Sequence, residues 1–175
     1  MRPSRQKFAA RILFFVLIAA GMTLPGGRLL AQGGEGPPFG PVRSWPELPA
    51  GWSLGEVTSI AEDHGGHIWV FNRSAHPLLE FTPDGRFVRS IAEDLVETAH
   101  GLIVDKDDHL YFTDGRAHVI RIVDVRTGKV LTQFGSGGSA AGEYQMPHEI
   151  ILSTTGDLYI ADLQNRRVQK LSPRP

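Results

Sequence analysis

Short stretches of alternating apolar and polar residues, separated by polar turns, run along most of the chain after residue 56. The clearest is Ala99–Val123, in which an apolar segment, the polar turn Asp105–Asp108 and two more alternating segments follow one another. Alternation with a period of two predicts β-strands that bury one face. The same order of segments occurs in Thr58–Phe81 and His148–Leu171, and no helical periodicity follows the N-terminal region. The pattern therefore predicts an all-β protein.

These three stretches are copies of one another. Superposing Ile60, Leu102 and Ile150 aligns them without a gap, at spacings of 42 and 48 residues. Three further sets of positions then coincide: Trp69, Tyr111 and Tyr159; Val70, Phe112 and Ile160; and Leu78, Ile120 and Val168. A repeat of about 40–50 residues made of short strands is typical of a β-propeller blade.

The repeats predict two four-stranded blades, at about 57–95 and 99–135, and a third at about 147–172 that ends after three strands. A short extended piece near Val42–Trp45 is expected to be an additional strand, of the kind that often completes the last blade of a closed propeller. Because propellers close with about 4–8 blades, we expect residues 42–175 to form the N-terminal part of a propeller. Its open sheet edges favour self-association.

The N-terminal region has the layout of a signal peptide. Residues 1–31 carry five bases and no acid, and Ile12–Thr23 is a 12-residue apolar run. Because a spanning helix needs about 20 apolar residues, we expect 1–31 to be a signal peptide, with a membrane anchor at residues 12–23 as the alternative. A Gly/Pro-rich spacer follows at 32–41. Either interpretation predicts export of the repeats to the periplasm or the extracellular space.

Composition and motifs exclude several classes of function. The residues after 31 include 13 bases and 19 acids, which argues against a nucleic-acid partner. The absence of cysteine excludes a disulfide scaffold, a thiolate zinc site and a cysteine nucleophile. Residues 105–116 begin like a calcium loop but lack glycine at the sixth place, and no serine hydrolase signature is recognisable.

Two histidines stand at equivalent places in the repeats. Thr58, His100 and His148 open the first strand of each copy, which lines the central channel of a propeller. Two neutral imidazoles that face one axis can converge on a metal such as zinc, which takes three protein ligands in catalytic sites. The alternative is that each histidine packs at the start of its strand.

Arg73 follows the second strand at the position that Gly115 and Leu163 occupy in the other copies. There an arginine can bind a carboxylate through two parallel hydrogen bonds, or remain a solvated loop residue. Asp63 and Asp105 are expected to form turns. The remaining histidines are expected to be solvated (His64, His67 and His109) or to lie at the surface or between strands (His76 and His118).

Parts of the sequence resemble known proteins. The third copy, with Gly156–Asp162 and Asn165–Leu171, resembles an NHL repeat. The wider run GWSLGEVTSIAEDHGGHIWVFNRSAHPLLEF, with AHGLIVD and MPHEIIL further on, resembles the peptidyl-α-hydroxyglycine α-amidating lyase family and its bacterial relatives. The resemblance covers about residues 42–172, the front half of that six-bladed fold.

The resemblance implies a site and a reaction. The family cleaves a peptidyl-α-hydroxyglycine into a peptide amide and glyoxylate, so the implied partner is a peptide substrate. Arg73 is implied to bind the substrate carboxylate, and His100 and His148 to bind zinc. The backbone carbonyls of Ile60 and Leu102 match positions that hold a structural calcium. In the family, zinc lowers the pKa of the bound hydroxyl and a tyrosine acts as base.

The chain also departs from the family pattern. The counterpart of the tyrosine loop is Asp162–Asn165, which has no tyrosine. The third zinc histidine and an acidic calcium ligand are expected beyond Pro175, and one blade is skipped between the second and third copies. Two functions therefore stay open: a lyase-like propeller that is inactive or incomplete as this fragment, and a non-catalytic NHL scaffold that binds protein or glycan.

Overall fold

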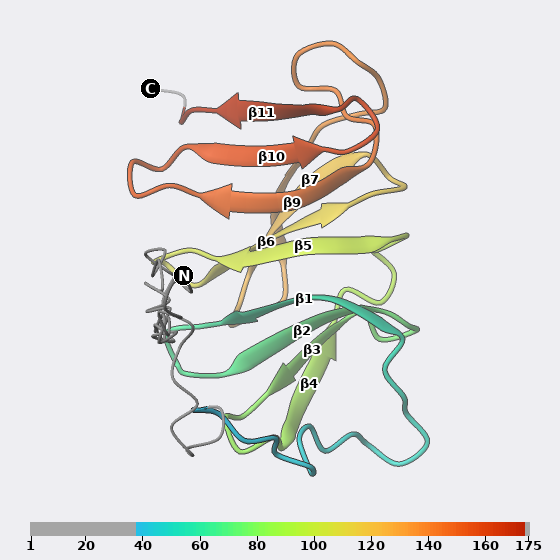
Figure 1. The fold of residues 1–175 in the computed structure, drawn as a ribbon, viewed down its shortest axis with the longest axis vertical. Helices are drawn as coiled ribbons and strands as arrows, with labels where there is room; N and C mark the ends of the chain where they lie inside the picture. The colour runs from blue at the N-terminus through green and yellow to red at the C-terminus, as the bar shows by residue number, and fades with distance from the viewer. Residues whose placement is uncertain (1–37, 174–175) are drawn as a thin grey trace, which may run out of the picture. The chain divides into compact units, whose positions relative to one another are not determined.

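The computed structural model describes residues 38–173, and these form eleven β-strands in three antiparallel sheets (Figure 1). Blade 1 contains β1 (Glu56–Glu62), β2 (Ile68–Arg73), β3 (Leu78–Phe81) and β4 (Phe87–Ile91). Blade 2 contains β5 (Ala99–Val104), β6 (His109–Asp114), β7 (Val119–Asp124) and β8 (Val130–Phe134). Blade 3 contains β9 (Pro147–Leu152), β10 (Leu158–Asp162) and β11 (Arg167–Leu171). The predicted all-β, partial propeller is confirmed.

The innermost strands β1, β5 and β9 lie side by side, and each sheet runs outward from them in chain order. Because side chains alternate between the faces of a strand, each blade offers one face to the blade before it and one to the blade after it. No helix long and apolar enough to cross a membrane occurs between residues 38 and 173. The predicted leader 1–31, with its apolar run, and most of the spacer 32–41 lie outside the described residues.

Three apolar clusters hold the blades. Between blades 1 and 2 the fully buried side chains include Trp69, Phe71 and Phe112, and the ring centroids of the two phenylalanines lie 5.3 Å apart. Between blades 2 and 3 the cluster consists of Ile120, Tyr144, Ile150 and Ile160. The third cluster lies on the other face of blade 1, where residues 45–54 cover Val70, Leu79 and Phe81. Each sheet is therefore stabilised mainly by burial against its neighbours.

A polar side chain at the end of each second strand fixes the segment that enters the same blade. The Asn72 Oδ1 atom accepts a hydrogen bond from the Gly55 N–H at 3.0 Å, and Asp114 Oδ1 accepts one from Thr98 N–H at 3.0 Å. Asp162 Oδ1 accepts one from Gln145 N–H at 2.7 Å. The three blades thus share one type of hydrogen-bonded joint, defined as the bond between the side chain that ends the second strand and the backbone of the incoming segment, although the connections leading into it differ in length.

The expected strand near Val42–Trp45 is not formed. Arg43 and Ser44 form a turn, and Trp45 lies against Phe81 with the ring centroids 5.8 Å apart. The Trp45 indole also donates a hydrogen bond to the Pro83 carbonyl at 3.2 Å. The prediction was wrong because a strand needs a neighbouring strand, and blade 1 already has four. The apolar face of blade 1 instead packs against the indole ring of Trp45.

Candidate functional site

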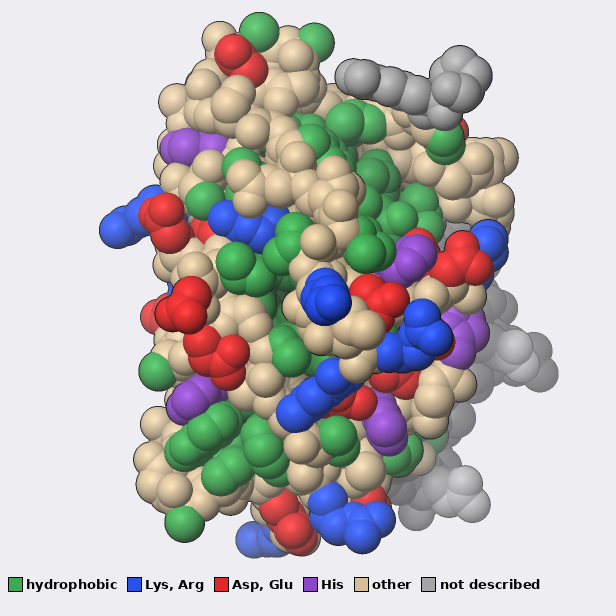
Figure 2. Space-filling view, turned by 180° about the vertical axis from the view of Figure 1, so that it is seen from behind, with side chains coloured by type: hydrophobic (Ala, Val, Ile, Leu, Met, Phe, Trp, Pro, Cys, Tyr) green, Lys and Arg blue, Asp and Glu red, His purple; other side chains and the backbone are tan. Residues whose placement is uncertain are grey.

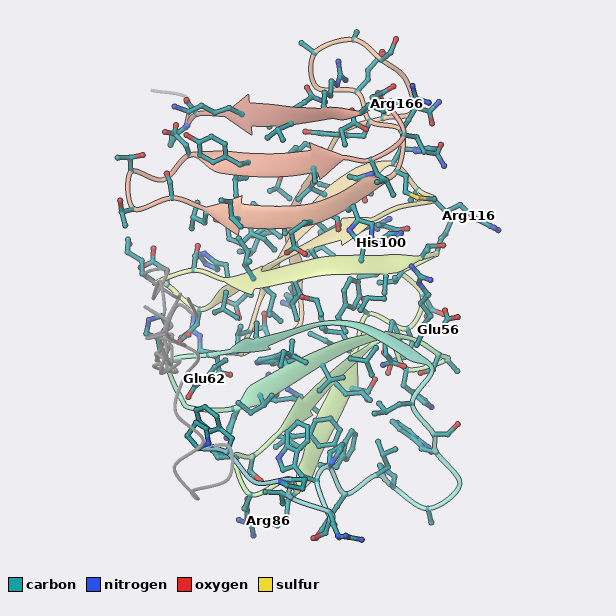
Figure 3. All side chains as sticks on the ribbon, viewed as in Figure 1. Glu56, Glu62, Arg86, His100, Arg116 and Arg166 are labelled. Carbon is teal, nitrogen blue, oxygen red and sulfur yellow. The ribbon has the colours of Figure 1, made fainter. Side chains whose placement is uncertain are left out.

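Each innermost strand carries a β-bulge at the same place in the repeat. The registers of β1, β5 and β9 shift next to Thr58, His100 and His148, which are the three aligned positions. A bulge inserts an extra residue and re-aims its side chain. The bulges therefore turn these residues out of the regular alternation near the start of each inner strand, where Figure 3 labels His100 on β5.

The two histidines lie against each other. The ring centroids of His100 and His148 are 4.3 Å apart, with an angle of 41° between the ring planes. His100 is 5% exposed and His148 is half-buried. Their backbones also approach closely, since a Cβ on Gly101 would lie 2.6 Å from the His148 carbonyl oxygen. The structure thus brings both predicted metal ligands together.

Thr113 links the two histidine-bearing strands. Its hydroxyl accepts a hydrogen bond from the Gly101 N–H at 2.8 Å and donates one to the His148 carbonyl at 2.6 Å. The bulge leaves the Gly101 N–H outside the β5–β6 ladder, so the side chain takes the place of a backbone partner. Sequence reasoning missed Thr113, because only the bulge creates the need for a hydroxyl there.

Arg73 reaches the same place from the end of β2. Its Nη2 lies 3.3 Å from His100 Nδ1 and 3.4 Å from His100 Nε2. Its Nε donates to the Ala99 carbonyl at 3.2 Å, and its Nη1 forms an ion pair with Glu56 at 3.1 Å. The guanidinium is therefore held in position between two blades rather than free in a loop.

Gly115 occupies the repeat position of Arg73 in blade 2, and its lack of a side chain makes room for His100. A Cβ on Gly115 would lie 2.4 Å from the His100 Cδ2 atom and 2.7 Å from Nε2. Both distances are far inside van der Waals contact. The exchange of arginine for glycine at this repeat position is thus what lets the two side chains share one site.

Burial is the main cause that lowers the pKa of His100 to about 4, and His148 and Arg73 add to it. The nearby Asp114 carboxylate acts in the opposite direction. His100 is consequently neutral at pH 7 and keeps a lone pair on one ring nitrogen, as a metal ligand requires. The guanidinium beside it makes the site favourable for an anion.

The two imidazoles are donors of the type that zinc takes, and they supply two of the three protein ligands usual for a catalytic zinc. Within residues 38–173, the one group of three metal-type donors is Asp63, His67 and Glu80, and it lies elsewhere. His100 and His148 are therefore the positions where a zinc ion could be held, with Arg73 as a neighbour.

The two predicted calcium residues lie on neighbouring inner strands. Leu102 is buried in β5, and its carbonyl accepts a hydrogen bond from the Ser59 hydroxyl of β1 at 3.4 Å. Ile60 follows Ser59 in β1, and its side chain is 65% exposed. Calcium takes 6–8 oxygen ligands, so two carbonyls would be a small part of such a site.

The strand-closing acids form turns, as predicted. Asp63 Oδ1 accepts the His67 N–H at 3.0 Å, and its Oδ2 accepts the Trp69 indole N–H at 2.9 Å. Asp105 repeats this arrangement in blade 2 with His109. The expectation that His67 and His109 are solvated was wrong, because each ring nitrogen bonds a buried carboxylate: Glu80 at 2.6 Å and Asp105 at 3.0 Å.

No tyrosine takes the place of the family's base in the expected loop. Asp162 accepts hydrogen bonds from Asn165 at 2.8 Å and Arg167 at 2.9 Å, so this segment is a structural turn. Tyr144 lies four residues before His148, but its ring is fully buried and burial raises the pKa of its hydroxyl. That shift is opposite to what a general base needs.

Comparisons with known proteins give the following relatives. A probable peptidyl-α-hydroxyglycine α-amidating lyase of Caenorhabditis elegans is 20% identical over 148 residues, covering 69% of this chain and 42% of that protein. A streptogramin B lyase structure matches with a TM-score of 0.57 and 20% identity, over 70% of this chain and 39% of that one. A catalytically inactive virginiamycin B lyase from Staphylococcus aureus, solved with quinupristin, matches with a TM-score of 0.55 and 15% identity, over 71% and 40%.

The chain thus spans about two fifths of the length of these relatives. No family model matches it. At such identities the solved structures show the propeller fold alone. The chain is a partial, lyase-like β-propeller that resembles the N-terminal part of the peptidyl-α-hydroxyglycine α-amidating lyases.

Proposed function

We propose that this chain contributes the front part of a site that cleaves a peptidyl-α-hydroxyglycine into a peptide amide and glyoxylate. The observation that carries the proposal is the meeting of Arg73 with His100, whose ring lies 4.3 Å from that of His148. These three residues come from three different blades and were singled out by their repeat positions. If Arg73 only packed between blades, an arginine would not be needed at this repeat position, where the other copies have Gly115 and Leu163.

Each residue has a separate task in the proposal. Arg73 binds the substrate carboxylate, because its guanidinium is already oriented by Ala99 and Glu56. His100 and His148 hold the metal through their ring nitrogens. Zinc at this place would lower the pKa of the substrate hydroxyl. The same burial that keeps His100 neutral excludes water from the reacting groups.

The setting of the reaction is also proposed. A signal peptide at 1–31 would export the chain to the periplasm or beyond, where peptides are available as substrates. The carbonyls of Ile60 and Leu102 would contribute to a structural calcium between β1 and β5. The general base is not among the residues assigned here, because the expected loop at Asp162–Asn165 has no tyrosine.

The experiment combines metal analysis with turnover. The purified chain is loaded with zinc and calcium, its bound zinc is measured by elemental analysis, and glyoxylate release from a peptidyl-α-hydroxyglycine is followed. We expect His100→Ala to lose the zinc. Arg73→Ala should keep the zinc and lower kcat/KM at least about tenfold, the worth of roughly 1.4 kcal/mol. Arg116→Ala is the matched control, since Arg116 is an exposed arginine of the next blade.

Two results would decide against the proposal. Unchanged zinc content in His100→Ala would refute the metal site. Zinc-loaded protein that binds a peptide amide as tightly as the same peptide with a free carboxylate would favour the alternative of a non-catalytic propeller scaffold. In that case Arg73→Ala would leave the binding of both peptides unchanged.

A further inference from the structure

The outer edge of β11 has no neighbouring strand among residues 38–173. Blades 1 and 2 each have a fourth strand on the corresponding edge, where β4 pairs with β3 and β8 pairs with β7. Both pairings contain a register shift at the same place, so the fourth strand is built alike in each. In blade 3 the same backbone groups of β11 are left without strand partners, which is a ready template for another strand.

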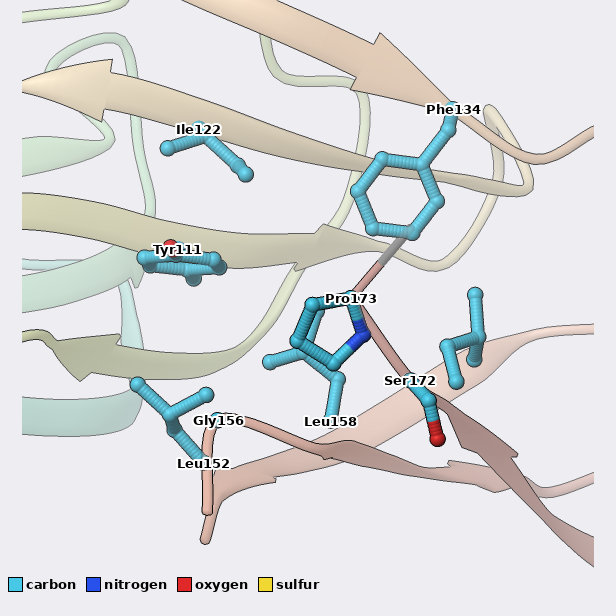
Figure 4. A pocket seen from close by; sticks show the side chains of 9 residues that line it. Tyr111, Ile122, Phe134, Leu152, Gly156, Leu158, Ser172 and Pro173 are labelled. Carbon is cyan, nitrogen blue, oxygen red and sulfur yellow. The ribbon is translucent and has the colours of Figure 1, made fainter. Parts of the chain in front are cut away.

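An apolar cavity lies beside this edge. It has a volume of about 460 Å³ and opens between blades 2 and 3, lined by Tyr111, Ile122 and Phe134 on one side and Leu158 and Leu171 on the other (Figure 4). Figure 2 shows hydrophobic side chains gathered in the upper half of that view. In blade 1 the residue opposite Phe81 is Phe87, whose ring packs on Phe81 with a centroid distance of 6.0 Å. A fourth strand in blade 3 would place a side chain opposite Leu171 in the same way, next to this cavity.

The face of blade 3 that points away from blade 2 continues the blade-to-blade interface seen twice in the chain. Tyr159 and Val168 occupy the repeat positions of Trp69 and Leu78, which are fully buried between blades 1 and 2. Val168 is 69% exposed and Ile151 is 55% exposed. This face therefore has the chemistry of an interior surface, and no blade among residues 38–173 covers it.

The sequence before blade 1 matches a fourth strand. Residues Val42-Arg43-Ser44 repeat the Val88-Arg89-Ser90 of β4. The connection that follows ends in the same joint as the connections between blades, with the Gly55 N–H on Asn72. Trp45 thus stands where Ile91 and Phe134 stand, and it packs against the face of blade 1 that would meet a preceding blade.

We propose that residues 41–45 of a second copy of this chain pair with β11 as the fourth strand of blade 3. In the register of blade 1, Trp45 of one copy lies opposite Val168 of the other, and Arg43 lies opposite Lys170. Trp45 keeps its contact with its own blade 1 and closes the gap to blade 3 of the other copy. The two positive charges are the weak point, which the ion pair of Lys170 with Asp157 at 2.9 Å reduces.

Residues 42–173 of two copies joined in this way bring six blades together, which is within the range at which propellers close. Such an arrangement contains two identical junctions related by a two-fold axis. At each junction the half-buried Trp45 and Tyr159 would be covered further, together with Ile151 and Val168, which are 55% and 69% exposed in one copy. The site residues of both copies then line one channel.

The test uses the full chain and measures its mass in solution by sedimentation. We expect a mass of two chains, and a mass of one chain for Val168→Asp with an unchanged circular dichroism spectrum. Val130→Asp is the matched control, because Val130 is an exposed valine of β8 that the pairing does not use. A wild-type mass of one chain at the highest soluble concentration would overturn the proposal.

Cross-linking tests the register, since the chain has no cysteine of its own. Protein carrying Arg43→Cys is mixed with protein carrying Lys170→Cys, and directly opposite positions on paired strands come close enough for a disulfide. We expect a covalent pair of one chain of each kind. A mixture of Arg116→Cys with Lys170→Cys should give none, and equal yields in the two mixtures would overturn the proposal. Neither measurement depends on zinc or on lyase activity.

Discussion

Replacement of Thr113 by valine tests whether the two histidine-bearing strands are coupled through one hydroxyl. Valine has almost the shape of threonine, so the substitution removes hydrogen bonds and leaves the packing intact. Thr113 is fully buried and bonds the Gly101 N–H at 2.8 Å and the His148 carbonyl at 2.6 Å. Both backbone groups would be left without that partner in a site closed to water.

The magnitude follows from the cost of unsatisfied groups. A buried donor or acceptor left without a partner costs about 1–3 kcal/mol, and two are affected, so we expect Thr113→Val to lower the free energy of unfolding by about 2–6 kcal/mol. Thr113→Ser keeps the hydroxyl and loses one methyl group, at about 1 kcal/mol. The order of the two variants therefore separates hydrogen bonding from packing.

Urea unfolding followed by tryptophan fluorescence measures both variants. Thr132→Val is the control, since Thr132 is exposed on β8 and its expected change is below about 0.5 kcal/mol. If Thr113→Ser proves more damaging than Thr113→Val, the hydroxyl is not what joins β5, β6 and β9. The coupling would then have to be sought in side-chain packing.

Two more predictions concern His100. Gly115→Ala places a Cβ 2.4 Å from the His100 ring, so we expect about 1–3 kcal/mol of destabilisation and loss of bound zinc. Gly40→Ala is the control, because its Cβ meets no atom within 4 Å and should change neither stability nor zinc content. Equal behaviour of the two variants would contradict the steric argument. In chelator-treated protein, the native pKa of His100 is about 4, below the ordinary 6.5. The contribution of His100 to the free energy of unfolding is therefore complete above pH 6.5. Stability should fall as the pH drops from 6.5 through 4, because the unfolded chain binds a proton that the native state lacks, by about 3 kcal/mol in all. Unfolding of wild type and His100→Gln across this range measures it, and parallel stability curves would show that His100 already carries the proton in the native state.

The repeat pattern predicted the architecture because each blade buries one set of alternate residues against its neighbour. Trp69, Tyr111 and Tyr159 occupy the same position of the repeat. None of them indicates a blade by itself, because the repeat is visible only when all three are aligned. The segment near Val42–Trp45 was predicted as a strand because an N-terminal strand often completes the last blade of a closed propeller. It failed because strand formation depends on a partner that the pattern of one segment does not contain.

Alignment of the copies selected the site residues, but their contacts depend on features that are silent in sequence. A bulge has no residue signature, so the need for Thr113 could not be foreseen. Gly115 was visible as the counterpart of Arg73, and its meaning became clear only from the ring that fills its place. The environment of His67 was predicted wrongly because its partner Glu80 lies on β3. Only the register between β2 and β3 shows that these two side chains meet.

The joint at the end of each second strand has a consequence for protein engineering. Asn72, Asp114 and Asp162 bind only the last residues of the incoming connection, so these hydrogen bonds do not depend on the length of its exposed part. Lengthening such a loop costs only about 0.6 kcal/mol for each doubling. Between Ile91 and Glu97, Ala92 and Val96 pack against the cluster between blades 1 and 2, so the exposed Glu93 and Asp94 are the place where a binding peptide or a reporter could be grafted without altering how the blades meet.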